Sequence, residues 1–183
     1  MYNQVSDTYI KTASGWVKSI QPSSDFYSGN GSEEYPFVIK DIPNGNTAVV
    51  QLTDTLRQEQ YVNKGYYYQL GQDIDLSGIY IKKIGSTDAP FIGHIDGNGY
   101  CISNLKLWDA ENVDLIGLFN SQTDAGSEIY NIHFKDIFVD TNSIINKSTT
   151  TTTTDMTFSM LNHIDNVYQV WIDGGSISSE TLW

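Results

Sequence analysis

Four side chains that can bind metals or move protons lie close together in the segment FIGHIDGNGYCISNLKL, residues 91–107. They are His94, Asp96, Asn98 and Cys101. Read as a calcium-binding loop, the segment places Leu105 where the bidentate carboxylate belongs. Read as a zinc site, it lacks two further soft ligands nearby. Because Asp-Gly-Asn-Gly at 96–99 is typical of tight turns, we expect a structural corner and no metal.

Carboxylates are the other candidates for chemistry. Glycoside hydrolysis needs two carboxylates roughly 5–9 Å apart, and Asp109, Asp136 and Asp173 lie near the ends of three similar segments. Turns favour Asp for conformational reasons alone. We therefore predict no enzyme, no catalytic residue and no cofactor. A glycan-degrading enzyme (a depolymerase) that uses Asp136 and Asp173 is the alternative.

The composition argues against several classes of partner. The 183 residues include 22 acidic and 10 basic side chains, a formal net charge of −12. Such a surface repels phosphate backbones and anionic headgroups, so nucleic-acid binding is not expected. No stretch approaches the roughly 18 apolar residues of a membrane span, so membrane insertion is not expected either. The first residues, MYNQVSDTYIKTASGW, lack the apolar segment of a secretory signal.

The pattern of turns divides the chain into an arm, a linker and one domain. Residues 1–22 contain the alternating segments TYIKT and WVKSI around Ala13-Ser14-Gly15, which predicts an N-terminal hairpin or arm. Residues 23–34 are rich in Pro, Ser and Gly and predict a linker. Residues 35–183 are the predicted domain.

Three segments of this domain align without gaps, namely CISNLKLWD (101–109), EIYNIHFKD (128–136) and NVYQVWIDG (166–174). Repeats of short strands predict a parallel β-solenoid, in which like residues stack on successive coils. Asn104, Asn131 and Gln169 share one polar position, and we expect them to form a structural ladder of amides along the axis.

One amphipathic helix is predicted at about 47–61, with Val49, Leu52 and Leu56 on its apolar side. Asn46 or Thr47 is expected to cap its start. A solenoid's first coil exposes unpaired backbone and an apolar core. We therefore expect this helix to cover the first coil as a cap.

Strand alternation also predicts which side chains face outward. One outer face would display aromatic and imidazole rings in stacked rows, namely Trp108, Tyr130, His133, Tyr168 and Trp171. Such rings bury against a partner chain or stack on sugar rings. We expect a subunit interface here, with glycan contact, or coverage by the Thr-rich insertion at 148–155 or the chain's own tail, as alternatives. The exposed aromatics and the absence of an evident second cap favour a homotrimer.

Four motifs occur in a fixed order, namely GNGSEEYPFVI, YYYQLGQDIDLSG, IGSTDAPFIGHIDGNGYCISNLKL and IGLFN. Over residues 29–140 this order resembles the N-terminal coils and cap of right-handed parallel β-helix domains with GLUG-type repeats, found in bacterial surface adhesins and phage proteins. YIKTASGWVKSI resembles a short N-terminal segment of phage virion proteins. The resemblance implies a scaffold for adhesion or assembly and carries over no catalytic residue.

Taken together, these features predict an all-β protein, a short right-handed parallel β-helix of about three coils with an N-terminal capping helix and arm. The predicted function is a non-enzymatic structural or adhesive module of a phage particle, such as a fibre, decoration or tail-associated protein. Its arm would bind other virion proteins, and host surface glycan is a further expected partner. The predicted location is the virion or an extracellular surface. A bacterial cell-surface adhesin domain is the second alternative.

Overall fold

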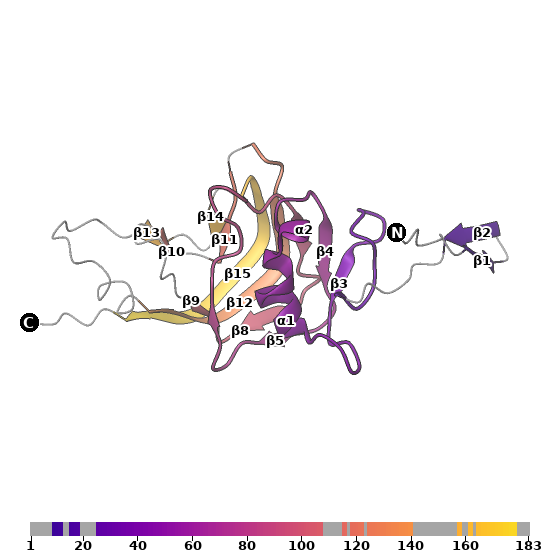
Figure 1. Ribbon diagram of the computed structural model, residues 1–183. Coiled ribbons are helices and arrows are strands. Elements are labelled where there is room, and N and C mark those ends of the chain that lie inside the picture. The colour runs from indigo at the N-terminus through magenta and orange to yellow at the C-terminus, as the bar shows by residue number, and fades with distance from the viewer. Residues whose placement is uncertain are drawn as a thin grey trace, which may run out of the picture.

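The computed structural model describes residues 9–12, 15–18, 25–107, 115–116, 118–122, 124–140, 157–158, 161–162 and 164–178. Strands dominate this part of the chain, and helices are few and short (Figure 1). The strands are β1 (Tyr9–Thr12), β2 (Gly15–Lys18), β3 (Phe37–Ile39), β4 (Tyr67–Leu70), β5 (Ile74–Asp75), β6 (Tyr80–Ile81), β7 (His94–Asp96), β8 (Cys101–Ser103), β9 (Lys106–Leu107), β10 (Leu115–Ile116), β11 (Phe119–Asn120), β12 (Glu128–Asp140), β13 (Thr157–Phe158), β14 (Leu161–Asn162) and β15 (Asn166–Ser178). The helices are α1 (Ala48–Thr53), the 3-10 helix η1 (Thr55–Arg57) and α2 (Glu59–Val62).

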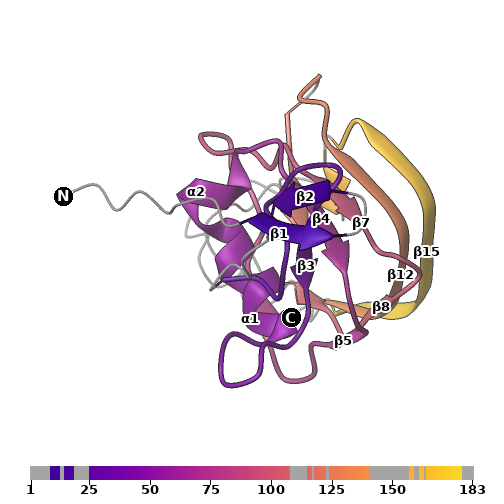
Figure 2. The same cartoon turned by 90° about the vertical axis from the view of Figure 1, so that its right-hand side faces the viewer.

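The strands after the hairpin pair in parallel and return to the same positions. The first stack runs β3–β4–β7–β12–β15, and the second runs β5–β8–β12–β15. A third joins β6 and β9 to β12, and β10–β13 and β11–β14 form further parallel pairs. The long strands β12 and β15 run through all three stacks (Figures 1 and 2). The chain therefore passes repeatedly around one core, which confirms the all-β class and the parallel arrangement.

We use the word pass for one such circuit, counted from one strand of the first stack to the next. Five passes are defined among the described residues, and they begin at Phe37, Tyr67, His94, Glu128 and Asn166. Inward side chains of successive passes meet in columns, because parallel strands in register place like positions side by side. Tyr68, Ile95 and Ile129 form one buried column, and Ile74, Ile102 and Phe134 form another.

The predicted alignment of residues 128–136 with 166–174 is confirmed, whereas the predicted alignment of residues 101–109 with 128–136 is wrong. Ile129 pairs with Val167, and Phe134 with Ile172, as predicted. Cys101, however, pairs with His133 and not with Glu128. The cause is the length of one corner, because residues 97–100 occupy the place of residues 131–132.

The predicted linker at 23–34 is wrong for residues 25–34. Phe26 is fully buried, and its ring stacks on Phe37 with 4.7 Å between centroids. The Tyr27 N–H donates to the Val38 carbonyl, and the Val38 N–H donates to the Ser28 carbonyl. Burial of an aromatic ring and pairing along β3 hold this segment on the body, so the folded unit begins before residue 35. The predicted hairpin is confirmed, because β1 and β2 pair antiparallel.

The single helix predicted at 47–61 is interrupted. Gln58 is extended (φ −67°, ψ 145°), which separates η1 from α2. Thr47 is the cap, since its Oγ1 accepts a hydrogen bond from Val50 N at 3.2 Å. The helices connect β3 to β4 and lie across the core from β12 and β15 (Figure 2).

The helices also differ from the predicted cap in what they cover. Leu52 and Leu56 are buried in the core, while the β3 backbone edge is paired by residues 27 and 28. The segment before β3, and not the helices, therefore covers this edge. The helices instead complete the first pass.

Among the described residues, no helix has the length and apolar character that crossing a membrane requires.

Candidate functional site

The outer face of the first stack carries two columns of side chains. Register places Tyr67, His94, Glu128 and Asn166 in one column, which we call the polar column. It places Gln69, Asp96, Tyr130 and Tyr168 in the next, which we call the tyrosine column. Both columns cross β4, β7, β12 and β15, so the strand register alone brings these side chains together.

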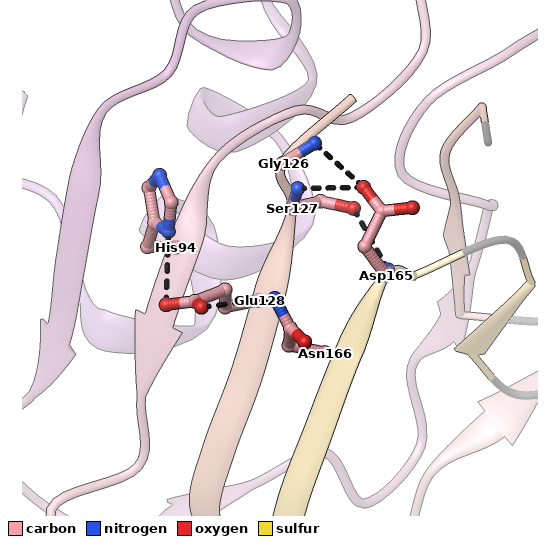
Figure 3. Close-up of polar contacts among 6 residues, drawn as sticks. All are labelled: His94, Gly126, Ser127, Glu128, Asp165 and Asn166. Carbon is pink, nitrogen blue, oxygen red and sulfur yellow. Dashed lines mark hydrogen bonds and ion pairs between the residues drawn. The ribbon is translucent and has the colours of Figure 1, made fainter. Parts of the chain in front are cut away.

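The members of the polar column are in continuous contact, and Figure 3 shows three of them, His94, Glu128 and Asn166. The Tyr67 ring stacks on His94, with centroids 4.1 Å apart and planes 8° apart. His94 Nδ1 lies 3.2 Å from Glu128 Oε2, and Asn166 Nδ2 donates to Glu128 Oε1 at 3.1 Å. The side chains of His94 and Glu128 keep 18% and 29% of their surface exposed. The column therefore presents polar groups in fixed positions and leaves them accessible.

The tyrosine column combines a carboxylate with two stacked rings. Gln69 Nε2 donates to Asp96 Oδ2 at 3.3 Å, and Tyr130 and Tyr168 stack with centroids 4.7 Å apart. Burial, together with the negative charge of Asp96, raises the pKa of Tyr130 to about 12. Burial also raises the pKa of Tyr168, with a smaller contribution from Glu128. Both hydroxyls are therefore neutral donors at physiological pH.

Asp165 fixes the corner that leads into β15 (Figure 3). Its carboxylate accepts hydrogen bonds from three backbone N–H groups, those of Asp124 at 2.9 Å, Gly126 at 2.6 Å and Ser127 at 3.2 Å. Hydrogen bonds from backbone donors to a carboxylate are among the stronger ones in proteins. This corner holds the last two passes in register directly beside the polar column.

The predicted outward rings are partly assembled. Tyr130 stacks on Tyr168, and His133 lies beside Trp171 in register. Tyr168 is 47% exposed and Trp171 is 54% exposed, whereas His133 is half-buried. His133 Nε2 is buried and has no hydrogen-bond partner among the described residues. Trp108 lies outside the described residues.

The predicted ladder of amides takes a different form. Asn131 and Gln169 occupy equivalent positions in adjacent strands, between the pairs Tyr130–Tyr168 and Ile132–Val170, and both have left-handed backbone (φ 54° and 52°). Asn104 is not in this column, since the register places it beside Asp136 and thus beside Gly174 on the next pass. Asn104 was misplaced because the predicted alignment of residues 101–109 with 128–136 is wrong. Asn104 and Asn131 suit corners because Asn tolerates the left-handed region well.

The side chains of Asn104 and Asn131 donate to carboxylates of the preceding pass. Asn104 Nδ2 donates to Asp75 Oδ1 at 2.8 Å, and Asn131 Nδ2 donates to Asp96 Oδ1 at 3.2 Å. The hydrogen bond from Asn104, with a smaller contribution from Ser77, lowers the pKa of Asp75. Each amide therefore joins two passes at a corner.

Residues 96–99 form a tight corner, as predicted. Asn98 and Gly99 have positive φ (52° and 77°), and Asp96 Oδ1 accepts a hydrogen bond from Asn98 N at 2.7 Å. Within the part of the chain that the structure describes, no three His, Cys, Asp or Glu side chains are grouped to hold a metal ion.

The carboxylates considered for catalysis do not stack as predicted. Asp136 is equivalent in position to Gly174, and Asp173 lies beside Lys135. Asp136 and Asp173 therefore belong to different columns, because the register aligns residue 135 and not residue 136 with Asp173. Asp109 lies outside the described residues.

Sequence reasoning missed the polar column. His94 was considered only as a metal ligand. The predicted alignment placed Glu128 beside Cys101, whereas the structure places it beside His94. One signal was present, because strand alternation that buries Tyr68 and Leu70 necessarily turns Tyr67 and Gln69 outward.

Comparison with known proteins finds similarity over part of the chain. A protein of Evansella cellulosilytica, whose name describes it as a Gly-rich membrane protein, is 35% identical over 103 residues, 53% of this chain and 11% of that protein. Halomucin of Haloquadratum walsbyi is 33% identical over 113 residues, 58% of this chain and 1% of that protein. The chain thus spans a small part of these relatives. No family model matches it, and no solved structure matches it at a significant level.

Proposed function

We propose that this protein is a non-enzymatic structural and adhesive module whose passes form a right-handed parallel β-helix. The support for the fold is the parallel register of β3, β4, β7, β12 and β15. Right-handedness follows from the general rule that parallel crossovers are right-handed in about 98% of cases. The motifs that resemble GLUG-type repeats agree with this assignment.

The observation that carries the adhesive role is the pair of outer columns. Side chains of four strands hold ring faces, carboxylates and amides in fixed rows. Carbohydrate hydroxyls bind to such carboxylates and amides, and sugar rings pack on aromatic faces. A rigid sheet loses little conformational entropy when it binds a ligand. We therefore propose a glycan as the ligand of this face.

The setting we propose is an extracellular surface. One relative is named as a membrane protein and another as a halomucin, and both names support a surface location. The phage particle, the virion proteins bound through the N-terminal arm and the homotrimer stay predictions from the sequence.

A glycan array probed with the full-length chain tests the ligand, and the affinities of variants test the face. Tyr168→Ala should weaken binding about tenfold or more, because it removes an exposed ring of the tyrosine column worth about 1–3 kcal/mol in stacking. Glu128→Gln should weaken it less, since it removes a charge and keeps a polar group.

Tyr80→Ala is the matched control, because Tyr80 is 52% exposed on β6, away from the two columns. It should bind glycan as the unchanged chain does. Absence of binding to every glycan, or an equal loss in Tyr80→Ala, would refute the proposal. Hydrolysis of a bound glycan would favour the depolymerase alternative.

A further inference from the structure

The two ends of the strand stack differ in how their backbone edges are covered. At the first end, residues 27 and 28 pair with β3. At the other end, β15 pairs with β12 alone among the described residues. The unpaired N–H and C=O groups along such an edge of the 13-residue strand β15 can form hydrogen bonds with another strand.

The inner side chains of β15 are also uncovered. Val167 is 46% exposed and Ile172 is 59% exposed. The residues beside them on β12, Ile129 and Phe134, are completely buried. The apolar core therefore continues to β15 and opens to solvent there. On the outer face, Tyr168 has Tyr130 on one side only, so its stack is open in the same direction.

We propose that β15 binds β15 of a second copy of this chain, antiparallel, about a two-fold axis that passes between Gln169 and Val170. A strand pairs with its own copy only where its sequence is complementary to its reverse. In this register, Val167 lies opposite Ile172 of the second copy. Tyr168 lies opposite Trp171 of the second copy.

The same register avoids contacts between like charges. Asn166 lies opposite Asp173 of the second copy, and Asp165 lies opposite Gly174 of the second copy. No two like charges face each other among these pairs, although each chain carries a formal net charge of −12. An amide facing a carboxylate can donate a hydrogen bond to it.

The backbone of β15 supports this register. Asn166 N–H donates to the Ser127 carbonyl, so it points toward β12, and alternation turns the amide of Val167 toward the open edge. His133 N–H likewise points to the preceding pass, at the Tyr100 carbonyl. Trp171 is its equivalent in register, so the amide of Ile172 also faces the open edge.

Two consequences follow for the pairs across the axis. Val167 and Ile172 both present N–H and C=O groups to the second copy, which makes them a hydrogen-bonded antiparallel pair. Tyr168 and Trp171 form the intervening pair without hydrogen bonds, in which side chains lie closest. Both aromatic side chains then face one another across the interface.

The alternation of side chains in β15 selects this register over its neighbours. Gln169 turns the strand with φ 52°, so two copies of β15 can pair along their length only if their bends lie close together. An axis between Gln169 and Val170 places each Gln169 opposite Val170 of the second copy, so the two bends lie one residue apart. A shift of one residue, which puts the axis through Gln169, would place inner side chains opposite outer ones.

The proposal goes beyond the adhesive function and does not depend on it. It predicts a two-fold dimer, where the sequence alone favoured a trimer. Light scattering of the full-length chain should give twice 20.5 kDa. Ile172→Lys should shift the mass to the monomer, because it places a charge against Val167 of the second copy. Val50→Lys is the matched control, since Val50 is an exposed valine on α1 (37% exposed), and it should remain dimeric.

Cross-linking tests the register itself, in a Cys101→Ser background that removes the native thiol. Tyr168→Cys combined with Trp171→Cys should give a disulfide-linked dimer on a non-reducing gel, because pairs without hydrogen bonds suit disulfide geometry. Tyr168→Cys combined with Asp173→Cys should not, because those positions are offset in this register.

A monomer or a trimer for the unchanged chain would overturn the proposal, as would a dimer that Ile172→Lys leaves intact in a folded variant. Equal cross-linking by both cysteine pairs would overturn the register. A monomer would show that β15 takes another occupant or none. Tyr168 belongs to both proposals, so Ile172→Lys, which keeps the Tyr168 ring, distinguishes loss of the dimer from loss of glycan binding.

Discussion

Phe134 and Ile172 occupy the same position on adjacent strands, yet Phe134 is completely buried and Ile172 is 59% exposed. The difference arises because Phe134 has a pass on either side, whereas Ile172 has one among the described residues. Position along the stack, and not residue type, thus decides how much an inward side chain contributes to the free energy of unfolding.

Phe134→Ala should destabilise the protein by about 3–5 kcal/mol, the usual cost of a buried Phe truncation. Ile172→Ala should change the free energy of unfolding by less than about 0.5 kcal/mol, as at other surface positions. Urea denaturation at low protein concentration measures both. Similar losses for the two variants would mean that Ile172 is covered in solution.

Gly97 lies where two passes meet at a corner. A Cβ at this position would overlap the Asn131 carbonyl oxygen and the Ile132 side chain, whereas a Cβ at Gly99 meets nothing within 4 Å. Gly97→Ala should therefore cost about 3 kcal/mol through overpacking. Gly99→Ala should cost about 1 kcal/mol, from its positive φ alone. Thermal melting of the two variants checks the order, and the reverse order would contradict this account of the corner.

Tyr130 should make stability depend on alkaline pH. Its pKa is raised from 10.0 to about 12, first by burial and then by Asp96. Between these values the unfolded chain releases the proton more readily, so this contribution is complete below pH 10 and is lost as pH rises toward 12.

Tyr130→Phe should weaken that dependence, because it leaves no hydroxyl to ionise. Unfolding free energies measured from pH 9 to 12 check this, with Tyr80→Phe as the control for loss of one tyrosine hydroxyl. Identical slopes for Tyr130→Phe and the unchanged chain would be incompatible with the raised pKa. Tyr68, whose pKa burial also raises, should maintain part of the slope in every variant.

Asp165 is exposed, yet we expect its carboxylate to stabilise the folded protein. Asp165→Ala removes the acceptor of three backbone hydrogen bonds, at an expected cost of about 2 kcal/mol. Asp165→Asn should cost less, because the amide keeps one acceptor oxygen. Asp88→Ala, at another exposed aspartate, is the control and should melt as the unchanged chain does. A melting temperature unaffected by Asp165→Ala would show that the corner is held by other contacts.

Local chemistry was enough to predict several parts of this protein. Strand alternation and turn residues gave the hairpin, the corner at 96–99 and the parallel all-β class. The ungapped match of 128–136 with 166–174 gave the correct register of β12 and β15. These succeed because stacked passes place like residues on like residues, so the sequence itself carries the repeat.

Only the tertiary structure decided the contacts that depend on corner length. The extra residues at 97–100 shift the earlier pass, and a shift of this kind cannot be read from apolar positions that fit more than one alignment. His94 therefore meets Glu128, and Asn104 leaves the column of Asn131, for reasons that lie in the stacking of passes. Phe26 is a further case, because a Ser- and Gly-rich segment reads as a linker until the ring it carries is seen in the core. The sequence by itself determined which residues alternate and where the chain turns, whereas hydrogen bonding between distant passes determined which side chains share a face.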